Sequence, residues 1–169
     1  MKKEQLKEGD LLFTVGDSEM GQAITTATGD YSHVAIYLEG SIYHATVDQG
    51  VSKQDLTSFL EENKIVDVFC YPKIKLKQVF EKVHALLGNP YNISFYPDGT
   101  GFYCSQLIAH LLPIFAEIPM QFGDGHQEVT NFWQEYYEQL GLAVPTGRPG
   151  TNPSLLAQSP QLCYRGRLK

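Results

Sequence analysis

The stretch on which the fold of this chain depends is Phe102-Tyr103-Cys104-Ser105-Gln106-Leu107-Ile108-Ala109-His110-Leu111-Leu112. It follows a glycine turn, Asp98-Gly99-Thr100-Gly101, and its apolar composition predicts a helix that opens at the cysteine. The first backbone N–H groups of a helix lack internal partners and carry partial positive charge. We therefore expect the Cys104 thiol to lose its proton easily and to act as a nucleophile.

Length and composition predict one globular domain that spans residues 1–169, because 43% of the residues are hydrophobic and 19% are charged. The net charge of −6 gives no electrostatic reason to expect nucleic acid or an anionic membrane as the main ligand. No apolar run reaches the ~18–20 residues of a membrane-spanning helix. No signal peptide is visible, so the expectation is a cytoplasmic protein, or an envelope or secreted one if a signal has been removed.

The cysteine count leaves room for a reactive thiol. Three cysteines, Cys70, Cys104 and Cys163, cannot all pair within one chain. No C-x-x-C spacing is present, which argues against a structural zinc knuckle. At least one thiol is therefore free, and we expect it to be Cys104, with Cys70 and Cys163 structural or incidental.

The secondary structure predicted around this helix is mixed. Strands are expected over 11–15, 32–38, 41–45 and 65–70, and helices over 18–28, 76–87, 106–115 and 129–140. The second and third strands form a hairpin around Glu39-Gly40. Residues 52–55 are expected to cap a short helix, and residues 145–160 to form an extended strap without regular structure.

The hairpin places two histidines near each other. His33 lies early in its first strand and His44 in its second strand, and neighbouring strands are only ~5 Å apart. The two imidazoles can therefore hydrogen-bond if they share a face. If His33 also reaches Cys104, then nucleophile, base and orienting group form a relay.

The two halves of this pattern resemble the NlpC/P60 papain-like superfamily. Gly88-Asn89-Pro90-Tyr91 followed by Gly101-Phe102-Tyr103-Cys104-Ser105 is similar to its cysteine-bearing half. His33-Val34-Ala35-Ile36-Tyr37 followed by Ile42-Tyr43-His44-Ala45 is similar to its histidine-bearing half. Here the histidine half comes first, as in the circularly permuted YiiX-like branch, which is related to lecithin–retinol acyltransferase.

The resemblance implies a fold and a set of roles. The fold would be α+β and papain-like, with an antiparallel sheet or partly open barrel packed against the nucleophile-bearing helix. Cys104 would be the nucleophile, His33 the general base and His44 the group that orients it, with the Cys104 N–H and the Tyr91 hydroxyl as oxyanion donors. The expected enzyme is a cysteine peptidase or amidase without cofactor or metal, acting on a small peptide or acyl-amide substrate.

Several alternatives stay open from the residues alone. The same Cys–His pair also serves enzymes that move or cleave lipid acyl groups. His33, His44 and Cys104 together could hold zinc, and an inactive binding module on the same scaffold is conceivable. Cys104 could also be an inert buried cysteine, and Tyr91 a core aromatic with a satisfied hydroxyl.

Overall fold

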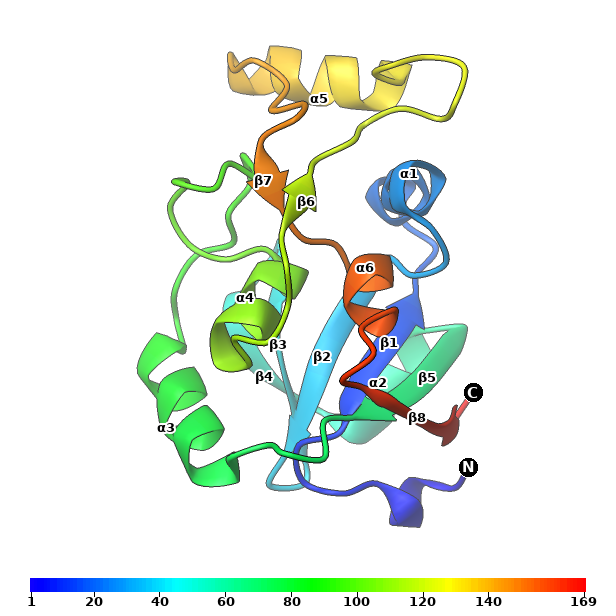
Figure 1. The fold of residues 1–169 in the computed structure, drawn as a ribbon, viewed down its shortest axis with the longest axis vertical. Coiled ribbons are helices and arrows are strands. Elements are labelled where there is room, and N and C mark those ends of the chain that lie inside the picture. Colours follow the sequence, from blue (N-terminus) through cyan, green and yellow to red (C-terminus); the bar gives the residue numbers. More distant parts are fainter.

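The computed structural model describes the whole chain, Met1–Lys169, and has the expected α+β architecture (Figure 1). A six-stranded antiparallel sheet has the order β4-β3-β2-β1-β5-β8. Its strands are β1 (Leu11–Val15), β2 (His33–Leu38), β3 (Ser41–Thr46), β4 (Gly50–Asp55), β5 (Ile65–Cys70) and β8 (Cys163–Arg167). A small second sheet pairs β6 (Ile118–Pro119) with β7 (Pro149–Gly150).

The helices lie on both faces of the sheet and above one end of it (Figure 1). They are η1 (Lys3–Gln5), α1 (Glu19–Thr28), α2 (Leu56–Glu62), α3 (Leu76–Leu86), α4 (Cys104–Leu111), α5 (Asn131–Leu140) and α6 (Pro153–Ala157). No helix combines the length and the apolar character that crossing a membrane would require.

Alternation along the strands divides the core into two layers. Phe13, Val34 and Ile36 contribute to the larger cluster, which also includes Leu107 and Ile108 of α4. The intervening residues Leu12 and Ala35 belong to a smaller cluster with Phe59 of α2. Successive strand side chains point to opposite faces, so one sheet buries a helix on each side.

The predicted hairpin, the strands over 11–15 and 65–70, and the helix that opens at Cys104 are all present. One local prediction was confirmed in part and another was wrong. Residues 52–55 belong to β4 and only Asp55 caps α2, through a 3.1 Å bond from the Ser58 N–H. Residues 145–160 contain β7 and α6. These elements are stabilised by distant partners, which local sequence patterns do not reveal.

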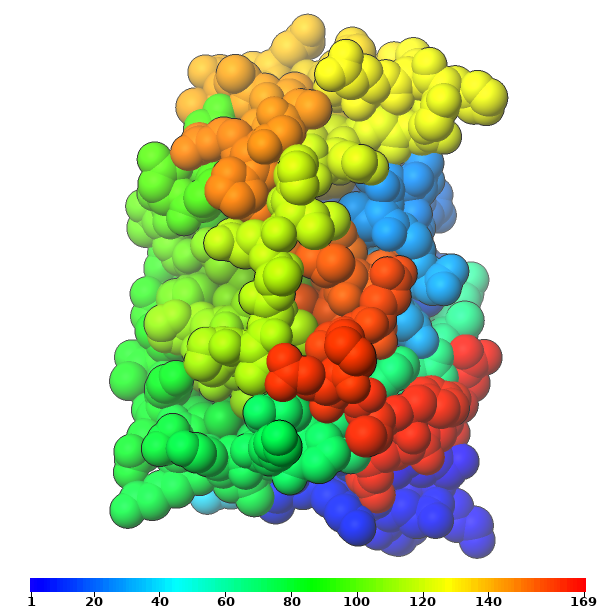
Figure 2. All heavy atoms as spheres, in the orientation of Figure 1, coloured from blue at the N-terminus to red at the C-terminus, as the bar shows by residue number.

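The C-terminal strand β8 was not predicted, because Cys-Tyr-Arg-Gly-Arg carries little apolar pattern. Two buried carboxylates hold it in place. Arg167 donates to both Asp67 oxygens at 2.8 and 2.9 Å, and Arg165 donates to Asp10. The N-terminal ammonium of Met1 donates to the Arg167 carbonyl at 2.9 Å, so the two ends of the chain lie together, blue beside red in Figure 2.

The loop before the nucleophile is held between two glycines. The Asn89 carbonyl accepts from the Val51 N–H at 2.9 Å, and the Pro90 carbonyl accepts from the Phe102 N–H at 3.0 Å. A Cβ added at Gly50 would lie 2.1 Å from the Asn89 oxygen, and one added at Gly101 would lie 1.9 Å from the Pro90 oxygen. Only glycine permits this approach, which places Tyr91 next to the segment that leads into Cys104.

This contact predicts that alanine substitutions at two glycines with nearly equal φ will lower the free energy of unfolding by different amounts. Gly88 (φ +87°) has no neighbour within 4 Å of an added Cβ, whereas Gly101 (φ +88°) meets the Pro90 oxygen. We expect Gly88→Ala to lower the free energy of unfolding by about 1 kcal/mol, from backbone strain alone. We expect Gly101→Ala to lower it by more than about 3 kcal/mol, because the loop must also move. Urea unfolding measures both, and equal losses would contradict the packing argument.

Candidate active site

Cys104 is the first residue of α4, and the residue before it has extended backbone. The Tyr103 N–H donates to Gln106 Oε1 at 3.1 Å, so a side chain from the first turn satisfies the backbone where the helix begins. The apolar residues Leu107, Ile108 and Leu111 anchor α4 on the sheet. Cys104 is only 4% exposed as a result.

The protonation state of Cys104 corrects the expectation of an acidic thiol. Backbone N–H groups of Val34, Ser105 and Cys104 itself do lower the pKa, as a helix start should. Burial has the larger effect and raises the pKa of the Cys104 thiol to about 11. In the free protein the cysteine is therefore a neutral thiol at physiological pH.

His33 and His44 do meet. His33 Nε2 and His44 Nδ1 are 3.0 Å apart, and both rings lie near Phe59 of α2, with centroid distances of 6.4 and 5.7 Å. Burial lowers the pKa of both imidazoles well below the usual value, and repulsion between the two rings lowers that of His33 further. The pair is neutral at pH 7, so one ring donates its N–H to the other.

Tyr91 lies beside the start of α4. Its phenol oxygen faces the backbone N–H of Cys104, while burial raises the pKa of the phenol well above its usual value. Tyr91 is therefore a neutral O–H donor beside the first N–H of α4. Its ring packs edge-on against Phe95 at a centroid distance of 6.0 Å, which fixes its orientation.

Cys104 and His33 flank the start of β2 without a direct bond in this structure. The Cys104 thiol lies against the Val34 N–H, the residue that follows His33, but no hydrogen bond joins it to the His33 ring. The thiol belongs to the α4 side of the sheet, and the histidines pack toward α2. Hydrogen bonds between catalytic groups are often long before substrate binds. Transfer of the thiol proton to His33 would therefore require the two groups to approach each other when substrate binds.

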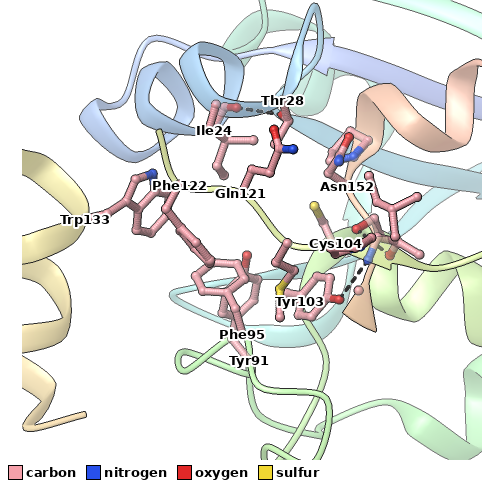
Figure 3. Close-up of a pocket in the computed structure, with 18 residues that line it drawn as sticks. Ile24, Thr28, Tyr91, Phe95, Tyr103, Cys104, Gln121, Phe122, Trp133 and Asn152 are labelled. Atoms are coloured by element: carbon pink, nitrogen blue, oxygen red, sulfur yellow. Dashed lines mark hydrogen bonds between the residues drawn. The ribbon is translucent and has the colours of Figure 1, made fainter. Parts of the chain in front are cut away.

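Two adjoining cavities open onto these groups. The first, called here the apolar cavity, has a volume of about 150 Å³ and contains the Cys104 sulfur (Figure 3). The second, called the histidine cavity, is larger and more polar, and it is lined by His33 and His44. Ile24 and Tyr91 line both cavities and so mark their border.

Sequence reasoning missed most of the apolar cavity wall. Phe122, Trp133 and Asn152 line this cavity together with Ile24 and Phe95 (Figure 3). Trp133 packs in α5 and borders the cavity: it is 2% exposed, and its Nε1 has no hydrogen-bond partner. Asn152 caps α6 through Leu155 N–H at 2.8 Å. Asn152 before Pro153 is a local pattern typical of a helix start. No local pattern shows that Asn152 or Trp133 reaches the cavity, because the wall is assembled from segments far apart in sequence.

The zinc alternative needs several ligands that converge on one point, and His33, His44 and Cys104 were the candidates. No group of three or more His, Cys, Asp or Glu side chains is arranged to hold a metal ion.

Comparisons with known proteins were consistent with this geometry. The family described as permuted papain-like amidase, YaeF/YiiX, C92 family, matches residues 5–164. The crystal structure of metalloprotein YiiX from Escherichia coli O157:H7 is similar, with a TM-score of 0.82 and 21% identity over 96% of this chain and 98% of that chain. At that identity the likeness shows the fold. No match was found among curated proteins.

The buried thiol predicts an unusual labelling profile. In a Cys70→Ser/Cys163→Ser background, iodoacetamide labelling of Cys104 should keep rising well beyond pH 9, because the thiol pKa is raised to about 11. If His33 draws the proton away, His33→Ala should slow labelling at pH 7 and leave the rate at pH 10.5 unchanged. A plateau reached near pH 7 in the unmodified active site would contradict the neutral-thiol state.

Proposed function

Because the chain belongs to the permuted papain-like amidase family, we propose that Cys104 attacks an amide carbonyl and forms an acyl-enzyme. The family makes the protein an enzyme of the cysteine peptidase or amidase kind. The observation that supports these particular residues is that Cys104 and His33 both lie at the start of β2 and that Tyr91 borders the cavities of both. Cys104 lies against Val34, Tyr91 lies against Cys104, and His33 is bonded to His44.

In the proposed first step, His33 takes the thiol proton as the Cys104 sulfur bonds to the carbonyl carbon. The Cys104 N–H and the Tyr91 O–H hold the negative oxygen of the tetrahedral intermediate. His33 then gives the proton to the leaving nitrogen as the C–N bond breaks. Water, deprotonated by the same imidazole, hydrolyses the thioester and releases a carboxylic acid.

His44 is proposed to set the tautomer of His33. If His33 Nε2 carries the hydrogen and donates it to His44 Nδ1, then His33 Nδ1 is free to accept a proton from the thiol. If His44 were protonated, its Nδ1–H would face the Nε2–H of His33, and no hydrogen bond could form between the two rings. The lowered pKa of His44 keeps it an acceptor through the neutral range.

A general base is useful here because the thiol is not ionised beforehand. Its raised pKa means that the sulfur gains nucleophilicity only as its proton is removed during attack. This differs from a preformed thiolate–imidazolium pair, which the pKa shifts of Cys104 and His33 disfavour. The buried state also protects the cysteine from unselective oxidation.

A lipid-directed acyl hydrolase or acyltransferase is the second candidate. The observation in its favour is the apolar cavity beside the sulfur, which could receive a hydrocarbon group. Both candidates use the same nucleophile and base, so they differ in the group that the cavity accepts.

The acyl-enzyme predicts a covalent adduct on one residue. After acid quench during turnover of an amide substrate, mass spectrometry should find the acyl mass on Cys104 and none in Cys104→Ala. His33→Ala should lower kcat/KM by about 10²–10⁴-fold. His44→Asn, which keeps an acceptor, should retain more activity than His44→Phe.

Two further readouts belong to this experiment. The acid limb of kcat/KM should lie below pH ~6.5, the usual pKa of histidine, because burial lowers the pKa of both rings. Turnover should survive a chelator, which a zinc enzyme would not. An adduct on another residue, or full activity in Cys104→Ala, would refute the mechanism.

A further inference from the structure

Resting on the proposed function, we propose that the substrate is an amide between a compact apolar acyl group and a polar amine. The acyl group would occupy the apolar cavity and the amine the histidine cavity. The balanced reaction is amide plus water to carboxylic acid plus amine. Three observations carry this assignment: which cavity holds each reacting group, how large the apolar cavity is, and what lines the other one.

The chemistry decides which part of the substrate enters which cavity. The sulfur becomes bonded to the acyl carbon, so the acyl group must extend on the Cys104 side. The imidazole must protonate the leaving nitrogen, so the amine must lie on the His33 side. Cys104 lines only the apolar cavity and His33 only the histidine cavity. The scissile bond therefore lies at their border, beside Ile24 and Tyr91.

The size of the apolar cavity limits the acyl group. Its volume of about 150 Å³ matches engineered apolar cavities of roughly 150 Å³ that take up one benzene ring. Its wall combines α1, through Ile24 and Ala27, with Phe122 and Trp133 (Figure 3). A benzoyl group or a short aliphatic acyl group fills this space, whereas a long fatty acyl chain would extend out of it through its open side.

The histidine cavity favours a polar amine. Its lining combines apolar side chains, among them Met20, Val47 and Phe59, with more polar groups than the apolar cavity has. Beyond the two histidines these polar groups are Asp17, Ser18, Thr46, Glu62 and Asn63. Asp17 already pairs with Lys64 at 2.8 Å, and Glu62 accepts from Gln54 at 3.0 Å. An alkyl chain buried against these groups would remove their water and would offer no hydrogen bonds to replace it, which costs free energy.

The test uses matched amides with the wild-type enzyme and two variants. We expect kcat/KM for N-benzoylethanolamine to exceed those for N-acetylethanolamine, N-palmitoylethanolamine and N-benzoylhexylamine by about tenfold or more. Ala27→Leu places extra carbon in the apolar cavity and should lower the benzoyl rate about tenfold while sparing acetyl. Thr26→Leu, at an exposed position one residue earlier on α1, is the control and should change neither.

The outcomes separate the substrate assignment from the mechanism. The substrate assignment would be overturned if the enzyme preferred the palmitoyl amide or the hexylamide. It would also be overturned if Ala27→Leu left the acyl preference unchanged. In each case an adduct on Cys104 would still support the mechanism. Hydrolysis that is unaffected by Cys104→Ala would overturn the mechanism itself.

A separate observation concerns the other two cysteines. We infer that Cys70 and Cys163 form a disulfide site that links the last residue of β5 to the first residue of β8. They are Cα partners in the antiparallel register. Directly opposed residues lie about 4.5–5.5 Å apart at Cα, within the roughly 4.4–6.8 Å that a disulfide spans. Opposed side chains also point to the same face.

The surroundings of the two thiols support this pairing. The preceding pair in the register, Phe69 and Tyr164, has its rings in contact at 5.2 Å, so opposed side chains do meet here. A charge on Cys163 is among the larger causes that raise the pKa of Cys70, which also places the sulfurs close together. Cys163 is exposed and accessible to an oxidant, unlike Cys104.

The oxidant proposed is a small or protein disulfide. The Cys163 thiolate attacks one of its sulfurs and releases a thiol, and Cys70 then attacks the mixed disulfide and releases the second thiol. Two protein thiols are oxidised and one external disulfide is reduced. The bond would enclose residues 70–163, including the nucleophile, and would leave Cys104 as the one free cysteine.

Oxidised and reduced glutathione with the native protein test this site. Non-reducing peptide mass spectrometry should find Cys70 linked to Cys163 and Cys104 still free. The thermal midpoint should rise by roughly 10 °C, because a loop of this length constrains the unfolded chain, and Cys163→Ser should abolish the rise. A glutathione adduct on Cys163 without the linked peptide would overturn the inference.

Discussion

The contact between the Pro90 carbonyl and the bare α-carbon of Gly101 is the constraint on which the rest of the site depends. The Phe102 N–H donates to that carbonyl at 3.0 Å, and a Cβ on Gly101 would lie 1.9 Å from it. Gly50 plays the same part on the other side of the loop, against Asn89. The loop can therefore run directly beside the segment that starts α4. This places Tyr91 at the N–H of Cys104, and no side chain could stand in the place of either glycine.

Burial then decides the charge of every reacting group. The helix start would favour a thiolate at Cys104, but loss of water around the sulfur outweighs it. The same burial keeps His33, His44 and Tyr91 neutral. The free site is thus a set of uncharged donors and acceptors, and charge would arise only as a substrate binds and the proposed proton transfer begins. Such a site suits a general-base mechanism better than a preformed ion pair.

The two cavities differ in polarity, and this difference would orient a bound substrate. The chain belongs to the permuted papain-like amidase family and shares its fold with the E. coli YiiX structure. Cys104 opens to the more apolar cavity, and the histidines open to the more polar one. Tyr91 and Ile24 stand between them. In the proposed reaction, Cys104 acts on the acyl half of the substrate and His33 acts on the amine half. The acyl product and the amine product would therefore form in different cavities.

The sequence alone determined the hairpin that carries His33 and His44, the start of α4 at Cys104, and the order of the two halves. These features follow from strand alternation, turn residues and short motifs, all of which act over a few residues. Only the tertiary structure decided the raised pKa of Cys104, the cavity wall at Phe122 and Trp133, and the pairing of β5 with β8. Each of these depends on segments that are distant in sequence and on the removal of water between them, which no local pattern encodes.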